Sequence, residues 1–305
     1  MIASIDIGGT KVAVGLVDHS GHIHAQRSAP TAPLATPEAG LSAISAMLGS
    51  MMDETGATLD GIGIGCTGPV YPLSGTVGWV EFLPGWEGAN LVAPLEKAFG
   101  VPAALENDAD APALGEWAWG AGQGKQTFLL VTVGTGIGAG LITSGRVYRG
   151  VDGAHPEIGH MVVDPAGPLC FCGAHGCWES LASGPSMARQ AQAAHPARVY
   201  RAASELCATA LAGDEHAQQA VERTAYYLGL GLANLVTLFT PEVIALGGGL
   251  MQALSQFRPG IDAVIAQMCK LVPKEQVRIM PAYFGAQAGL VGAARVGLAA
   301  IEHGL

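Results

Sequence analysis

The sequence predicts an α/β protein built from two related lobes. Its 305 residues exceed what one compact core usually organises. Predicted strands alternate with predicted helices along the chain, which is typical of α/β folds. A plan of strand, Gly/Thr hairpin, strand, turn and strand begins near Ile5 and recurs near Val131, about 125 residues later. Repeated units of this kind indicate two related lobes that face each other.

The predicted elements follow this repeat in order. In the first copy, one strand ends at residue 7 and two more cover 12–17 and 22–26. They are followed by a helix over 37–55, a buried strand over 61–65 and an irregular loop over 67–87. The first copy ends with a helix over 91–99 and a strand over 101–105. In the second copy, strands cover 131–133, 138–142 and 146–148, followed by a loop-rich insert over 150–179, helices over most of 186–239, a buried strand over 242–246 and a helix over 285–301. We expect the last helix to return to the first lobe. The predicted domains are residues 1–108 plus about 286–305, and residues 109–285 with the insert.

Composition excludes several classes of partner. The net charge is −10 with a pI of about 5.3, and no basic stripe that would bind nucleic acid is visible. The chain opens directly on a predicted strand, without the basic start and apolar stretch of a secretion signal. The most apolar helix, near 226–239, is too short and too polar to span a bilayer. We therefore expect a cytoplasmic protein with no membrane partner.

The two Gly/Thr hairpins are candidate phosphate sites. The first contains Gly8, Gly9 and Thr10, and the second contains Gly134, Thr135 and Gly136. Glycine leaves backbone N–H groups open to phosphate oxygens, and threonine adds a hydroxyl donor. Ordinary β-hairpins are the alternative, because glycine is common there too. Two matched copies favour the phosphate interpretation.

Asp6 and a third glycine turn extend the same prediction. Asp6, at the end of the first strand, could hold Mg²⁺ through water. Gly248 and Gly249, in the turn over 247–249, follow a buried strand and would let an adenine or ribose lie against the backbone. Close packing of helix on strand explains that turn almost equally well.

Asp108 is the candidate catalytic base. Asn107 and Asp108 close a strand and lead into a helix, where α/β sheets usually bind ligands. Phosphoryl transfer needs a carboxylate that accepts the hydroxyl proton. Helix capping is the alternative, since both residue types are preferred caps. Asp110 is a rival carboxylate, but at strand or helical spacing it points elsewhere.

The insert contains a predicted zinc site. Cys170, Cys172, Cys177 and His160 form a Cys₃His set suited to tetrahedral Zn²⁺, with His175 as a competing imidazole. A closed structural site of this kind would hold a loop that has no secondary structure of its own. Glu157 and Glu179 flank the set and could bind a polyol, or they could be ordinary exposed carboxylates.

Together these motifs resemble the ROK family of repressors and sugar kinases, within the actin-like ATPase superfamily. The resemblance covers essentially the whole chain: residues 6–11 are similar to the first phosphate motif, 134–138 to the second, 133–160 to the long family signature, and 170–179 to the zinc loop. It implies the two-lobed actin-like (ribonuclease H-like) fold with a cleft between the lobes.

The resemblance also implies an activity, namely ATP-dependent phosphorylation of a hexose 6-hydroxyl. Asp108 would be the base; Asn107, Glu157, His160 and Glu179 would bind the sugar; the cofactors would be ATP, Mg²⁺ and structural Zn²⁺. Lys11 belongs to the first phosphate motif, and His160 could serve both zinc and sugar. The assembly implied is a homodimer or homotetramer.

Glucose is the expected sugar, with fructose, mannose, N-acetylmannosamine and N-acetylglucosamine as alternatives. Family members often have Asn in an Asn-Leu-Pro-Gly-Trp pattern, where this chain has Phe82, so the sugar contacts there differ. A sugar-responsive repressor of the same family is the alternative from another class. It would need an N-terminal helix-turn-helix, and we expect none here because the chain opens on the first strand.

Overall fold

The computed structural model describes residues 1–34, 36–80 and 83–303. Its contacts divide the chain into two units, which are described separately: unit 1 is Met1–Gly124, Gly140–Pro156 and Tyr283–Leu305, and unit 2 is Lys125–Ala139 and Glu157–Ala282. This division keeps the segments 109–124 and 140–156 with unit 1, because they pack on its helices. The domain boundaries expected from the sequence stay a prediction.

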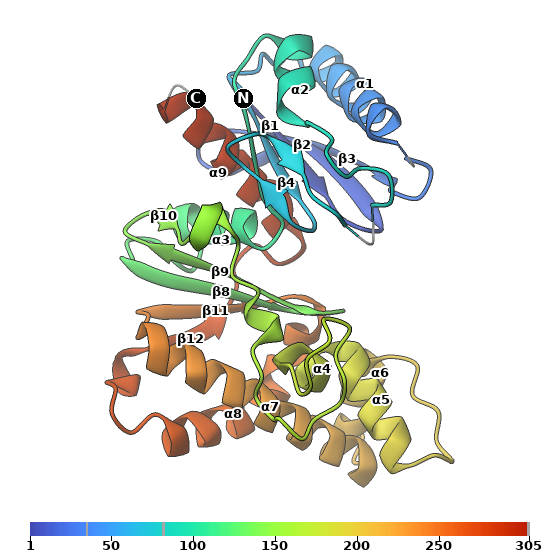
Figure 1. Ribbon diagram of the computed structural model, residues 1–305, viewed down its shortest axis with the longest axis vertical. Helices are drawn as coiled ribbons and strands as arrows, with labels where there is room; N and C mark the ends of the chain where they lie inside the picture. Colours follow the sequence, from blue (N-terminus) through green and yellow to red (C-terminus); the bar gives the residue numbers. More distant parts are fainter. Residues whose placement is uncertain (35, 81–82, 304–305) are drawn as a thin grey trace. The chain divides into compact units, whose positions relative to one another are not determined.

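Unit 1 is built on a five-stranded mixed sheet in the order β3-β2-β1-β4-β7 (Figure 1). The strands are β1 (Ile2–Ile7), β2 (Lys11–Val17), β3 (Ile23–Pro30), β4 (Gly61–Cys66) and β7 (Ala103–Asn107). The first three form an antiparallel meander, whereas β1, β4 and β7 run parallel. The carboxyl ends of the three parallel strands therefore meet at one edge of the sheet.

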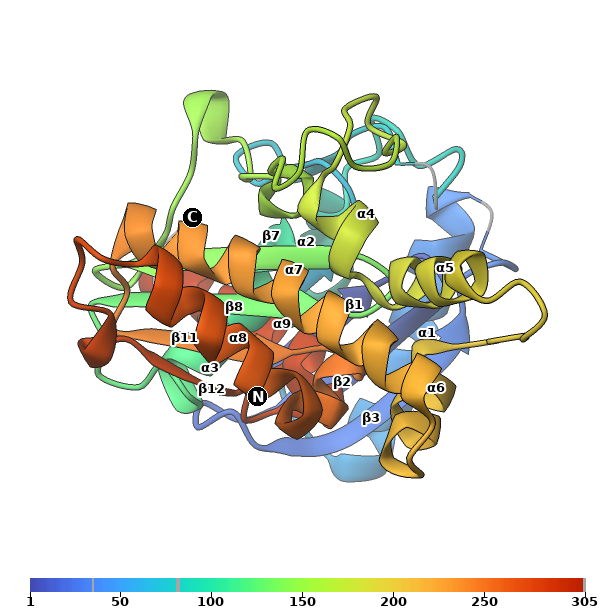
Figure 2. The ribbon, with the colours of Figure 1, turned by 90° about the horizontal axis from the view of Figure 1, so that it is seen from below.

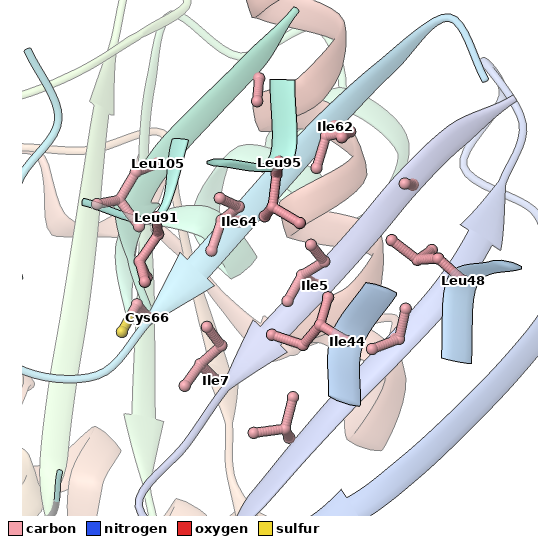
Figure 3. Packing of buried hydrophobic residues seen from close by; sticks show 14 of the residues in the cluster. Ile5, Ile7, Ile44, Leu48, Ile62, Ile64, Cys66, Leu91, Leu95 and Leu105 are labelled. Atoms are coloured by element: carbon pink, nitrogen blue, oxygen red, sulfur yellow. The ribbon is translucent and has the colours of Figure 1, made fainter. Parts of the chain in front are cut away.

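The two faces of β4 differ because glycine and isoleucine alternate along it. A Cβ added at Gly63 would lie 1.7 Å from the carbonyl oxygen of Ala293 in α9 (Ala288–His303), so this face accepts a helix backbone in direct contact. Ile62 and Ile64 point the other way, into the cluster shown in Figure 3. That cluster joins the sheet to α1 (Pro37–Thr55) and α2 (Val92–Phe99). The final helix thus packs on unit 1, as predicted.

The bounds of α1 match those predicted, because local signals mark both ends. The side chain of Thr36 accepts a hydrogen bond from Ala39 N–H at 3.3 Å, and Pro37 occupies the first turn. Gly56 ends the helix with a φ of 67°, a conformation that favours glycine.

The second sheet has the order β10-β9-β8-β11-β12, which repeats the connectivity of the first. Its strands are β8 (Thr127–Val133), β9 (Ile137–Thr143), β10 (Arg146–Val147), β11 (Val243–Gly247) and β12 (Arg278–Pro281). The division by contacts falls within β9. Since β8, β11 and β12 run parallel as β1, β4 and β7 do, the structure confirms the predicted repeat.

The helices of unit 2 pack through small residues. They are α4 (Trp178–Ala182), α5 (Gly184–Ala194), α6 (Ala203–Leu211), α7 (Glu215–Phe239) and α8 (Leu254–Met268). A Cβ added at Gly229 of α7 would lie 2.7 Å from Val264 of α8, and one at Gly260 would lie 2.7 Å from Ala225. Figure 2 shows α7 and α8 side by side, as this close approach requires.

The remaining elements connect these layers. They are α3 (Asp110–Trp119), the short strands β5 (Val70–Tyr71) and β6 (Thr76–Val77), and the 3₁₀ turns η1 (Val151–Gly153), η2 (Ile158–His160), η3 (Gly249–Ala253), η4 (Lys274–Gln276) and η5 (Gly285–Gln287). The loop expected to be irregular thus contains a small hairpin, and β12 lies in a stretch for which the sequence predicted no strand. Within the described part of the chain, no helix is both long and apolar enough to cross a membrane.

Candidate active site

Two carboxylates lie at the carboxyl edge of the first sheet. Asp6 pairs in register with Gly65, and Cys66 pairs with Asn107, so the residues after all three parallel strands come together. Burial, and then the nearby charge of Asp108, raise the pKa of Asp6 from its ordinary 3.8 to about 6, and Lys11 opposes this shift. Burial and the same two carboxylates also hold the pKa of the Cys66 thiol above its usual range. Asp6 and Asp108 thus form one electrostatic site.

Asn107 shapes the turn that carries Asp108. Its Oδ1 accepts a hydrogen bond from Ala109 N–H at 2.8 Å, and its Nδ2 donates to the carbonyl of Gly68 at 3.1 Å. The backbone N–H of Asp108 donates to the Cys66 carbonyl at 3.0 Å. The N-cap residue of α3 is Ala109, which makes no side-chain cap bond. The N-cap position, which was the alternative role for Asp108, thus falls on the next residue along the chain.

Asp110 is held away from this edge. Its side chain is 1 % exposed and pairs with Arg149 and with His155. A carboxylate this deeply buried cannot reach a substrate hydroxyl, so Asp110 is excluded as an alternative catalytic base.

The first Gly/Thr hairpin is closed by backbone bonds. Gly8 N–H donates to the Lys11 carbonyl at 2.9 Å, and the hydroxyl of Thr31 donates to the Gly8 carbonyl at 2.8 Å. Thr10 and Lys11 are exposed and Gly9 is half-buried, so the tip of the hairpin is accessible. Because the Gly8 and Lys11 carbonyls accept these hydrogen bonds, the tip presents the Thr10 hydroxyl, the Lys11 ammonium group and the backbone of Gly9.

The second hairpin is tied to Glu179 in unit 2. Gly134 N–H donates to the Gly136 carbonyl at 2.9 Å, and Ile137 N–H donates to Glu179 Oε2 at 2.8 Å. A Cβ at Gly136 would lie 2.3 Å from the Glu179 carboxylate, so only glycine allows this approach. Thr135 is exposed at the tip. Sequence reasoning missed this bond between hairpin and carboxylate, because the two lie over forty residues apart.

The two glycines predicted in the third turn have different surroundings. Gly248 has a φ of 88°, and a Cβ there would lie 2.4 Å from the Val133 carbonyl oxygen, so this glycine serves close packing. At Gly249 an added Cβ meets nothing within 4 Å, and the Gly249 nitrogen lies 3.9 Å from the Cβ position of Gly134. Only Gly249 offers open backbone, beside the second hairpin.

The predicted zinc ligands converge. The donor atoms of His160, Cys170, Cys172 and Cys177 all lie within 4.8 Å of one another. His160 Nδ1 lies 3.5 Å from Cys170 Sγ, and Cys172 Sγ lies 3.5 Å from Cys177 Sγ. Zn–S bonds of about 2.3 Å in a tetrahedron place sulfurs roughly 3.8 Å apart, so the set fits zinc. The competing imidazole, His175, is exposed and lies 3.1 Å from the Gly167 carbonyl instead.

Trp178 anchors the segment between the cluster and Glu179. Its indole lies on Gly231 of α7, where an added Cβ would lie 2.0 Å away, and its Nε1 donates to the Tyr227 carbonyl at 2.8 Å. The fully buried ring fixes both of its chain neighbours, Cys177 and Glu179.

The remaining sugar-site candidates lie near the same hairpin. A Cβ at Gly159 would lie 2.0 Å from the Ile137 carbonyl oxygen, so η2 is packed against the start of β9. This contact places His160, the last residue of η2, beside the hairpin. Glu157, the residue just before η2, is exposed. Phe82 lies outside the described residues.

A cavity of about 230 Å³ opens beside the second hairpin within unit 2. Its polar lining includes Thr135, Glu179, Ser180, Ser183, Ser186 and Arg189. Arg189 donates to the Ser186 hydroxyl at 2.8 Å, so its guanidinium is oriented at the rim. No local pattern in the sequence marks these serines or Arg189 as lining a cavity, so sequence reasoning missed them.

Comparison with known proteins agrees with this geometry. The family model described as ROK family matches residues 2–299. The chain is 34 % identical to a glucokinase of Streptomyces coelicolor over 95 % of both chains. It is 33 % identical to an N-acetylmannosamine kinase of Shigella flexneri, over 96 % of this chain and 97 % of the relative.

Solved structures show the same similarity. The ROK hexokinase of Thermus thermophilus superposes with a TM-score of 0.88 at 35 % identity, covering 99 % of both chains. A ROK family glucokinase of Streptomyces griseus, solved in complex with glucose and AMPPNP, has a TM-score of 0.79 at 32 % identity, covering 98 % of this chain and 99 % of that one.

Proposed function

Because this chain belongs to the ROK family, we propose that it is an ATP-dependent hexose kinase that phosphorylates the 6-hydroxyl of its sugar, with glucose preferred. The actin-like fold implied by the sequence is confirmed by the ROK structures that superpose on the chain. One observation carries the activity: Asp6 and Asp108 share the carboxyl edge of a sheet whose first hairpin exposes glycine backbone and a threonine.

Asp108 is the general base in this proposal. Its carboxylate accepts the proton of the sugar 6-hydroxyl as the hydroxyl oxygen bonds to the γ-phosphorus of ATP. The bond from that phosphorus to the β–γ bridging oxygen breaks, and ADP leaves with the electron pair. The turn fixed by Asn107 holds the carboxylate for this transfer.

The hairpins and Asp6 handle the nucleotide. The proposed phosphate donors are Thr10, Lys11 and Thr135, together with the N–H groups of Gly9 and Gly136, and Gly249 would border the nucleoside. Asp6 would hold Mg²⁺ through water, and the metal when bound neutralises phosphate charge.

Four polar side chains are the proposed sugar contacts, and two of them have one donor or acceptor atom engaged already. Glu179 Oε2 accepts a hydrogen bond from Ile137 N–H, so Oε1 is the oxygen that we propose accepts a sugar hydroxyl. His160 directs Nδ1 at the zinc set, which leaves Nε2 for the sugar. Asn107 and Glu157 complete the proposed contacts. Zinc when bound would lock the loop that carries these groups.

A coupled assay of ADP release with separate sugars tests the activity. We expect the highest kcat/KM with glucose and lower values with fructose, mannose and the N-acetylhexosamines. A higher kcat/KM with N-acetylmannosamine would favour the second candidate, which the Shigella relative supports. No sugar-dependent ADP release with any of them would refute the proposal. Sedimentation of the protein would test the expected homodimer or homotetramer.

Asp108→Asn tests the base. We expect turnover to fall by about 10²–10⁴-fold, the usual contribution of general base catalysis, with sugar affinity retained. Unchanged turnover would refute the assignment of Asp108.

A further inference from the structure

Unit 1 contains a buried ionic network with no role in the mechanism above. Arg149, just after β10, pairs through Nη2 with Glu106 of β7 and through Nη1 with Asp110 at the start of α3. His155 Nδ1 lies 2.7 Å from Asp110 Oδ2. The side chains are 21 % (Arg149), 11 % (Glu106), 1 % (Asp110) and 13 % (His155) exposed. Both partners of the guanidinium are therefore largely withdrawn from water.

The network brackets the candidate base. Glu106 comes two residues before Asp108, and Asp110 comes two residues after it. Glu106 Oε1 also accepts the backbone N–H of Asn107 at 2.7 Å. Arg149 thus joins the last residues of the strand to the first residue of the helix, across the turn that carries Asp108.

The charges make Arg149 indispensable to this arrangement. Two carboxylates face one guanidinium, and burial raises the pKa of Glu106 although Arg149 lowers it. Oδ1 of Asp110 is buried without a hydrogen-bond partner among the described residues. Removing one partner of a buried pair leaves an uncompensated charge, so without Arg149 the two carboxylates would move apart or toward water.

We propose that Arg149 is a positioning residue for catalysis, which fixes the turn of Asp108 by bridging the carboxylates on either side of it. The proposal rests on the proposed function, because it acts through the assigned base. His155 adds a second anchor from the same segment to Asp110. A displacement of about 1 Å at a reacting group can lower the rate roughly 100-fold. The network can therefore influence catalysis simply by keeping the turn of Asp108 in place.

Arg149→Met and Arg149→Lys test the proposal in the full-length protein. We expect Arg149→Met to lower kcat about 100-fold while the KM values for sugar and ATP stay within about threefold. Arg149→Lys retains a charge but cannot bridge two carboxylates in a fork, so we expect a smaller loss of about tenfold. The control is Arg27→Met, which removes an exposed ion pair with Glu54 on the same unit and should leave kcat unchanged.

The decisive measurement combines Arg149→Met with Asp108→Asn. A residue that acts only by placing the base has little to add once the base is gone, so we expect less than about a twofold further loss of residual turnover. An independent 100-fold loss in that background would overturn the proposal, as would unchanged kcat in Arg149→Met. If Arg149→Met does not fold, Arg149→Lys is combined with Asp108→Asn under the same criterion. Failure of the proposed function is distinct, since the wild type would then show no sugar-dependent ADP release at all.

Discussion

Asp6→Asn should stabilise the protein at neutral pH while removing activity. The Asp6 carboxyl has its pKa raised from 3.8 to about 6 by burial and by the charge of Asp108. Below pH 4 the group is protonated in both the folded and unfolded states and contributes nothing. Between pH 4 and 6 the unfolded state loses its proton first, so the free energy of unfolding falls as pH rises, by about 3 kcal/mol in total. The asparagine variant lacks this loss.

Urea denaturation from pH 3 to 7.5 measures the effect. We expect Asp6→Asn and the wild type to converge below about pH 3.5 and to differ by up to about 3 kcal/mol above pH 6.5, with the variant more stable. Asp53→Asn, at an exposed position of α1, should follow the wild type throughout. Asp108→Asn should show a smaller pH dependence than the wild type, because one source of the shift is removed. A constant difference between Asp6→Asn and wild type over the whole range would refute the reasoning.

Three further predictions concern zinc and glycine positions. Metal analysis should find about one zinc per chain, and Cys172→Ser should lose the metal and expose the loop to protease; a fully folded, metal-free wild type would contradict the zinc assignment. Gly63→Ala should lower the free energy of unfolding in urea by about 3 kcal/mol or more, because the added Cβ would overlap the Ala293 carbonyl. The control is Gly49→Ala, in open space on α1, which should raise it by about 0.5–1 kcal/mol. Equal effects of the two substitutions would refute the packing argument. Gly136→Ala should displace the Glu179 carboxylate and raise the KM for sugar, and an unchanged KM would argue against a sugar contact by Glu179.

Local signals explain how much of the fold the sequence predicted. Both ends of α1 were predicted because Thr36, Pro37 and Gly56 mark them chemically. The repeat was predicted because both hairpins combine glycine and threonine between two strands. The zinc ligands were predicted because three cysteines fall within eight positions of one loop.

The errors fall where distant residues decide the structure. The strand predicted over 101–105 runs instead from Ala103 to Asn107, because Glu106 and Asn107 become buried partners of Arg149 and of the following turn. The residues next to Glu106 in sequence do not indicate that an arginine over forty positions away pairs with its carboxylate. The edge strand β12 was missed because its residues are mostly exposed and it ends in Pro281, so it lacks the apolar alternation of a strand. The roles of individual site residues stay predictions for the same reason.

The two repeats keep one topology and divide the chemistry of the proposed reaction between them. At the position of Asp6 in β1, the second copy has Thr132 in β8, whose hydroxyl donates to the Gly138 carbonyl at 3.3 Å. In the first copy β4 ends in Cys66 and Asp108 follows β7, whereas in the second copy β11 is followed by Gly248, which packs on Val133. In the proposed reaction, the two carboxylates that would bind the cation and accept the proton therefore both belong to the first copy. The other copy presents uncharged backbone, and its nearby carboxylate, Glu179, is tied to Ile137 N–H. A carboxylate at position 132 would repel the phosphate oxygens that we propose bind at the second hairpin, so an uncharged residue there suits the proposed role of that hairpin.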